Sequence, residues 1–145
     1  ISSNNIYASG LLEECKTLVS KLKINENVKF FTDFLDEHVI EVLLQASDIV
    51  VYNYSEAGES ASGAVRNGIA SLNPVIITNI KQFNEFGNEC FRIETNSSQS
   101  VANGIDEILN DRDLGRDLVE LEKKVLKENN LDNKSLETLR IMSKA

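Results

Sequence analysis

Two short apolar runs constrain the fold more than any other feature of this sequence. They occupy residues 48–52, which read DIVVY, and residues 74–78, which read PVIIT. Near-continuous β-branched runs of this length are typical of strands covered on both faces, and proline is compatible with the first strand position. A small-residue helical segment lies between them, at about residues 60–71. Strand, helix and strand in this order predict parallel strands joined by a right-handed crossover.

The same alternation extends over most of the chain. Apolar residues recur at helical spacing in residues 11–22 and 39–44, and Asp36 and Glu37 stand where the second of these helices begins. Shorter runs predict further strands, and the remaining polar-apolar patterns predict three more helices. The expected strands are residues 28–31 and 90–93, and the expected helices are residues 99–110, 114–128 and 134–143.

These elements predict an α/β fold, a Rossmann-like three-layer domain with a four-stranded parallel sheet and helices on both faces. Four strands make a small sheet for this architecture. We therefore expect one or two strands to precede Ile1, and the absence of an initial methionine fits a piece cut from a longer protein.

Composition and charge exclude several classes of protein. The 145 residues, 41% of them apolar, suit a single packed domain, and no apolar run approaches the roughly 18 residues that span a bilayer. Nothing resembles a signal peptide, so we expect a soluble domain. A net charge of −8 without a concentrated basic face argues against nucleic-acid binding. Cys15 and Cys90 form no CxxC motif, which favours reduced thiols in the cytosol.

The most unusual local composition follows the first apolar run, at residues 53–64, which read NYSEAGESASGA. Ligands of open α/β sheets bind beyond the carboxyl ends of the strands, and the free amides and dipole of a helix N-terminus favour an anion. Four consecutive residues there have little or no side chain to block a diphosphate: Ser60, Ala61, Ser62 and Gly63. The alternative is that Ser60 or Ser62 only caps the helix, and that the small residues allow close helix–sheet packing.

Glu59 favours the ligand interpretation. A carboxylate beside a phosphate site is repulsive unless it binds something else, and neutral sugar hydroxyls are suitable donors for it. A phosphate site next to such a carboxylate indicates a nucleotide sugar.

Glu59, Asn67 eight positions later and the Pro-Val-Ile run at residues 74–76 resemble the signature of a large retaining glycosyltransferase family with the GT-B fold, called group 1 or family 4. Two flanking strands agree with it, since residues 27–31 resemble its NVxF strand and residues 46–51 its AD(I/V)xV strand. The resemblance covers about residues 11–114. It implies that residues 1–145 form half of a GT-B fold, the C-terminal nucleotide-sugar-binding domain, with the amino-terminal acceptor domain and the start of this domain absent.

The resemblance assigns roles to particular residues. Glu59 would be the catalytic glutamate that contacts the donor sugar, and Asn67 would bind the donor ribose where the family has a second glutamate. The diphosphate would lie on Ser60, Ala61, Ser62 and Gly63, and the donor base near Phe31, Thr32 and Asp33. Glu85 falls where the family often has a glutamate, whereas Leu72 replaces its usual glycine, and the family's basic Arg–Lys pair is expected before Ile1.

The implied reaction is transfer of the sugar with retention, in bacterial polysaccharide or glycoconjugate synthesis, without a cofactor or a metal ion. The implied partners are a nucleotide-sugar donor, an unknown acceptor and the missing amino-terminal domain, and the implied location is the cytoplasm, at the inner membrane face through the missing part. Residues 111–113 spell the DxD motif that holds metal in the other major glycosyltransferase fold, but here Asp111 or Asp113 is expected to cap a helix. The single histidine, His38, is expected on the surface.

Two other functions remain open at this point. One is a non-catalytic α/β binding module with a degenerate donor site, which the departures at Asn67 and Leu72 favour. The other is half of a sugar-nucleotide epimerase, which shares the two-domain architecture.

Overall fold

The computed structural model describes the backbone of residues 3–55 and 61–142, and the side chains of residues 10–55 and 62–129. The chain divides into two compact units, residues 1–35 and 36–145. None of the helices in the described part of the chain is both long and apolar enough to cross a membrane.

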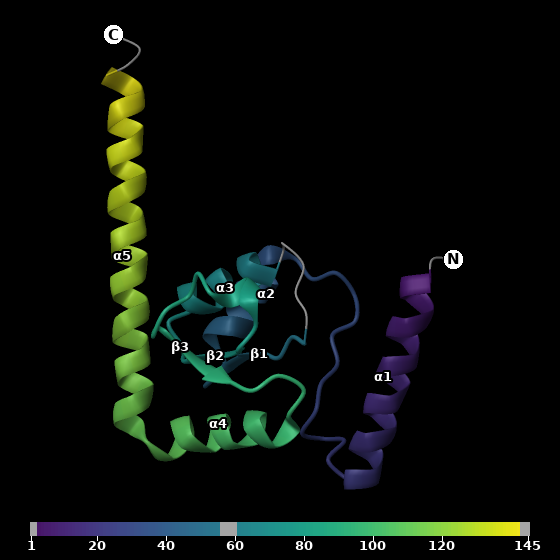
Figure 1. Ribbon diagram of the computed structural model, residues 1–145. Coiled ribbons are helices and arrows are strands. Elements are labelled where there is room, and N and C mark those ends of the chain that lie inside the picture. The colour runs from purple at the N-terminus through teal and green to yellow at the C-terminus, as the bar shows by residue number, and fades with distance from the viewer. Residues whose placement is uncertain (1–2, 56–60, 143–145) are drawn as a thin grey trace. The chain divides into compact units, whose positions relative to one another are not determined.

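The first unit consists of helix α1 (Ser3–Leu22) and an irregular segment that follows it (Figure 1). The helix ends where Lys23 adopts a left-handed conformation with φ of 58°. The amides of Lys23 and Ile24 then donate to the carbonyls of Ser20 and Val19 at 3.1 and 3.2 Å, the arrangement of a Schellman motif. This ending satisfies carbonyl groups that a helix otherwise leaves unpaired.

The strand predicted at residues 28–31 is wrong, because this segment is irregular. Phe30 and Phe31 are exposed rather than packed in a core. An apolar run becomes a strand only where its side chains pack and its backbone groups pair with a neighbouring strand, so β-propensity is a weak guide for a short segment.

The second unit is built on a parallel sheet in the order β1-β2-β3, formed by β1 (Val50–Tyr52), β2 (Val75–Thr78) and β3 (Cys90–Ile93) (Figure 1). In register, Val50 pairs with Val75 and Val75 pairs with Cys90. The α-helices of this unit are α2 (Glu37–Gln45), α3 (Ala61–Ala70), α4 (Ser98–Asn110) and α5 (Arg112–Met142), and the short 3-10 helix η1 (Lys81–Phe83) follows β2.

Alternate side chains of the strands point to the two faces of the sheet. On one face Val75 and Ile77 pack with Val65 and Ile69 of α3. On the other face Ile76 packs with residues of α4 and α5, and Figure 1 shows α3 and α4 on opposite sides of the strands. These layers confirm a Rossmann-like three-layer fold, although the described residues form three strands rather than the expected four.

The C-terminal region differs from the prediction in one further respect. The helices expected at residues 114–128 and 134–143 are parts of the single helix α5. The sequence after Gly115 contains neither glycine nor proline, the two residues that most strongly end a helix, so nothing in it interrupts α5.

Candidate functional site

The carboxyl ends of β1 and β2 place two segments at the same edge of the sheet. The chain leaving β1 leads into α3, and the chain leaving β2 leads through η1 to Glu85. Parallel neighbouring strands have their carboxyl ends at one edge, where open α/β sheets bind ligands. Glu59 and Ser60 lie outside the described residues, and the backbone of Ala61 begins α3.

The first turn of α3 contains Ser62 and Gly63, as the sequence predicts. Gly63 is exposed, and a Cβ added to it would meet no described atom within 4 Å. Ser62 is half-buried. The described side chains therefore leave open space beside Gly63 in this first turn.

A hydrogen bond from the end of β1 fixes the position of α3. The Tyr52 hydroxyl donates to the carbonyl oxygen of Ala64 at 2.5 Å, and burial, more than any other cause, raises the pKa of Tyr52 to about 12. Gly68 passes so close to this ring that a Cβ would lie 2.8 Å from Cε2 of Tyr52. Only glycine therefore allows this approach of helix to strand.

A second contact holds the chain that leaves β1. Thr78, the last residue of β2, is fully buried, and its Oγ1 donates to the carbonyl of Tyr54 at 2.7 Å and lies 3.2 Å from the Tyr54 amide, from which it accepts. The Tyr54 ring packs edge-on against Phe83 with ring centroids 5.8 Å apart. The sequence did not predict these hydrogen bonds between Thr78 and Tyr54, because a threonine at the end of an apolar run gives no sign of its partner.

Glu85 forms an ion pair with Arg66 of α3, in which Arg66 Nη2 donates to Oε2. Arg66 stands four residues after Ser62, so the two side chains lie on the same face of the helix. Hydrogen bonding from the Ser62 side chain, and then the charge of Arg66, lower the pKa of Glu85 against the opposing effect of partial burial. Arg66 and Glu85 also line a hollow of about 350 Å³ that extends toward Val125 and Leu126 of α5.

Asn67 lies in a different hollow, of about 210 Å³, between α3 and α2. Its neighbours there include Glu41 and Gln45. Neighbouring residues of α3 therefore line two separate hollows. Arg66 lines the one toward α5, and Asn67 lines the one toward α2. The residues expected to bind the donor base, Phe31, Thr32 and Asp33, are exposed in the first unit.

With this geometry in place, comparison with known proteins identifies the family. The family model described as "Glycosyl transferases group 1" matches residues 9–125, which is more than half of the chain. The chain belongs to the group 1 glycosyltransferases.

Solved structures agree with this assignment. The group 1 glycosyltransferase chain resembles the C-terminal domain of a group 1 family protein, LpcC, from Francisella tularensis, with a TM-score of 0.71, 21% identity and coverage of 82% of this chain and 62% of that one. It also resembles a glycosyltransferase from Rickettsia africae (TM-score 0.69, 26% identity, coverage 90% and 36%). A third similar structure is sucrose-phosphate synthase from Thermosynechococcus elongatus (TM-score 0.64, 18% identity, coverage 87% and 34%).

These likenesses place the fold among the C-terminal domains of GT-B glycosyltransferases. The chain spans less than two thirds of each of these structures. A search of the curated proteins finds no significant match.

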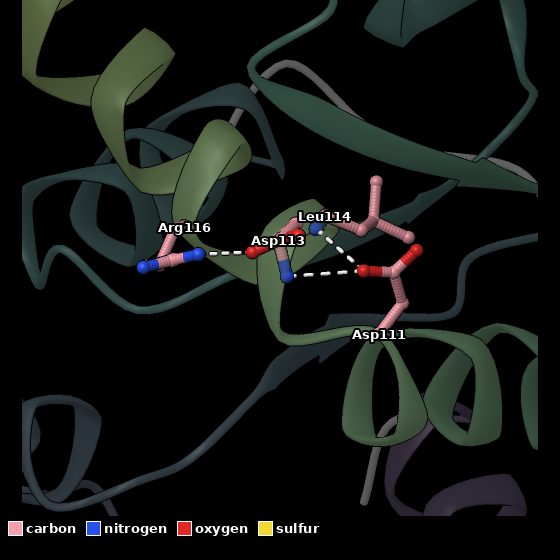
Figure 2. Close-up of polar contacts among 4 residues, drawn as sticks. All are labelled: Asp111, Asp113, Leu114 and Arg116. Atoms are coloured by element: carbon pink, nitrogen blue, oxygen red, sulfur yellow. Dashed lines mark hydrogen bonds and ion pairs between the residues drawn. The ribbon is translucent and has the colours of Figure 1, made fainter.

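The DxD motif of this group 1 glycosyltransferase caps a helix, as expected. Oδ1 of Asp111 accepts from the amides of Asp113 and Leu114, both at 3.0 Å, and Asp113 pairs with Arg116 (Figure 2). His38 is exposed, with Nδ1 3.8 Å from the carboxylate of Glu41. Among the described residues no cluster of three or more His, Cys, Asp or Glu side chains is arranged to hold a metal ion.

Proposed function

We propose that this group 1 glycosyltransferase chain binds a nucleotide-diphosphate sugar at the start of α3, and that the whole protein transfers the sugar to an acceptor with retention. The family match and the likeness to a C-terminal glycosyltransferase domain support this proposal. The acceptor would bind to an amino-terminal domain of the same enzyme. The product would belong to bacterial polysaccharide or glycoconjugate synthesis on the cytoplasmic side of the inner membrane.

One observation carries the proposal. Helix α3 is the next element after β1, and its first turn includes an exposed glycine with no described atom near its Cβ position. The unpaired amides and the dipole of a helix N-terminus favour an anion at such a place. The Tyr52 hydroxyl and the close approach at Gly68 hold the helix in position before a ligand arrives.

In this proposal the amides of Ser60, Ala61, Ser62 and Gly63 stabilise negative charge on the leaving diphosphate. Amides that are already oriented do this without reorganisation, as the donors of an oxyanion hole do. Glu59 contacts the donor sugar, Asn67 the ribose, and Phe31, Thr32 and Asp33 the base. The reaction then needs no metal ion or cofactor, because the helix N-terminus and cationic side chains balance the charge.

A leucine at position 63 tests the site without disturbing the fold. Leucine favours a helix more than glycine does, and the described residues leave room for its side chain. We expect Gly63→Leu to fold normally but to weaken binding of UDP, GDP, UDP-glucose or GDP-mannose by about tenfold or more, because the side chain obstructs the first-turn amides.

Gly10→Leu is the matched control. Gly10 is also an exposed helical glycine with no described atom within 4 Å of its Cβ position, but it belongs to α1. Binding is measured by titration calorimetry, and the amide resonances of Ser62 and Gly63 are followed by NMR. Equal affinities for Gly63→Leu and Gly10→Leu, or no response of these two resonances to any of the four nucleotides, would overturn the proposal.

A further inference from the structure

The start of α3 already has a carboxylate beside it. Glu85 arrives from the loop after β2 and pairs with Arg66, which stands one turn after Ser62 on the same face of α3. It is a protein anion at the place where the proposed function puts the donor diphosphate. The side chains of Arg66 and Glu85 are 61% and 39% exposed, so an incoming anion can reach both.

The guanidinium group that Glu85 engages is one that a phosphate would also use. Arg66 has five N–H groups, but its charge is balanced by the carboxylate with which it pairs. A diphosphate at the first turn therefore meets one negative charge and a guanidinium that is already paired.

We propose that Glu85 is a resident anion that competes with the donor diphosphate for Arg66 beside the first turn of α3. The inference rests on the proposed function and adds a regulatory element to that site. The lowered pKa of Glu85 supports it, because the carboxylate is ionised at neutral pH. The competition weakens binding of a free nucleoside diphosphate, which is the product that must leave after sugar transfer.

The decisive variant is Glu85→Gln, which keeps the shape of the side chain and removes its charge. We expect UDP and GDP to bind this variant about three- to tenfold more tightly than the original chain at low ionic strength, because one negative charge near the diphosphate is gone. The gain should shrink as salt is added, since salt screens exposed charges. Unchanged or weaker binding would overturn the inference.

Glu120→Gln is the matched control. Glu120 is an exposed glutamate on α5 that pairs with Lys123, so its substitution changes the net charge of the chain equally without affecting the Ser62–Arg66 face of α3. We expect UDP and GDP affinities within about twofold of the original chain. If Glu120→Gln tightens binding as much as Glu85→Gln does, net charge alone explains the effect and the competition is refuted.

A second measurement uses Arg66→Gln in two backgrounds. While Glu85 is present the guanidinium is engaged, so its removal should cost little nucleotide affinity; in the Glu85→Gln background it should cost several-fold more. Equal losses in both backgrounds would contradict the competition. If the original chain binds neither UDP nor GDP, the proposed function itself fails, whereas binding without the Glu85 effects removes only this inference.

Discussion

Glu85 and Glu122 are the same side chain in opposite surroundings. Glu85 follows the carboxyl end of β2, is partly exposed and forms an ion pair with Arg66. Glu122 is fully buried on α5, near the residues that begin β2 and β3, and neither of its oxygens has a hydrogen-bond partner among the described residues. The pKa of Glu85 is lowered, whereas that of Glu122 is raised to about 8.

The causes of the two shifts explain the difference. Burial is the largest cause for Glu122, the charge of Glu89 adds to it, and the nearby amide of Val75 opposes it. Glu89 is itself buried but accepts from the amide of Gly87 with both oxygens at 2.9 Å. A carboxyl group keeps its charge where water and donors reach it and gives it up where they do not. Glu85, at the edge of the sheet where the candidate site lies, therefore carries a charge that a ligand can meet. Burial suppresses the charge of Glu122 on α5.

The largest effect tests how the loop that presents Glu85 is held. Phe83 is fully buried, packs edge-on against Tyr54 and Phe86, and its carbonyl accepts from Arg92 Nη2 at 2.9 Å. We expect Phe83→Ala to lower the free energy of unfolding by about 3–5 kcal/mol, because it leaves a cavity in the core. Urea unfolding followed by circular dichroism measures this change.

Phe34→Ala is the control for that substitution. Phe34 is fully exposed, so the loss of its side chain creates no cavity and should change the stability by less than about 0.5 kcal/mol. Similar losses for the two variants would mean that the loop before Glu85 is not anchored in the core. Glu85 would then have no fixed position at this edge of the sheet.

The next effect tests whether Glu122 is uncharged in the folded chain. Between the ordinary pKa of 4.5 and the folded value of about 8, the folded chain keeps the Glu122 proton that the unfolded chain has released, so stability falls as pH rises through this range. We expect Glu122→Gln to remove this fall and to stabilise the chain at pH 8 by about 1–3 kcal/mol. Urea unfolding at pH 5, 6.5 and 8 measures the slope.

Glu120→Gln, two positions away on the same helix, is the control, because Glu120 is exposed. Its pH dependence should match that of the original chain. If Glu122→Gln also keeps the original slope, then Glu122 is ionised in the folded state, and the proposed contrast with Glu85 is wrong.

The sequence predicted the elements of the second unit because their signals are local. The three strands and helices α3 and α4 appear within about two residues of the predicted bounds, since buried apolar runs and helical stripes can be identified in short windows. The strand predicted at residues 28–31 is wrong because a strand depends on partners that a short window does not contain. The predicted break in α5 is wrong because the sequence there has no glycine or proline to end the helix.

The site was predictable only in part, for the same reason. The position of Ser62 and Gly63 at the start of α3 follows from a strand, a polar loop and small residues in succession. The contact of Glu85 with Arg66 joins segments nineteen residues apart, which no spacing rule covers. The burial of Glu122 did leave a signal, because it stands four residues after Leu118 and three before Val125 on the apolar side of α5.

The smallest effect concerns the folding contribution of Glu85. Exposed ion pairs such as Arg66–Glu85 contribute little to stability, so we expect Glu85→Gln to change the free energy of unfolding by less than about 1 kcal/mol at pH 7. Any contribution should have a pH dependence opposite to that of Glu122. Because the pKa of Glu85 is lowered below 4.5 in the folded chain, its contribution is present above that pH and is lost as the pH falls further.

Urea unfolding of Glu85→Gln and of the original chain, at pH 7 and at pH 3.5, tests both the size and the pH dependence of this contribution to the free energy of unfolding. A loss well above 1 kcal/mol at pH 7 would make Glu85 a structural residue, and any change in nucleotide affinity would then report on folding. A small loss of stability that vanishes at low pH would mean that the Glu85 carboxylate contributes little to folding. It would still be charged at pH 7 and accessible to an incoming anion. In that case the charge at this edge of the sheet serves the ligand site, whereas the buried glutamate on α5 affects only the stability of the fold.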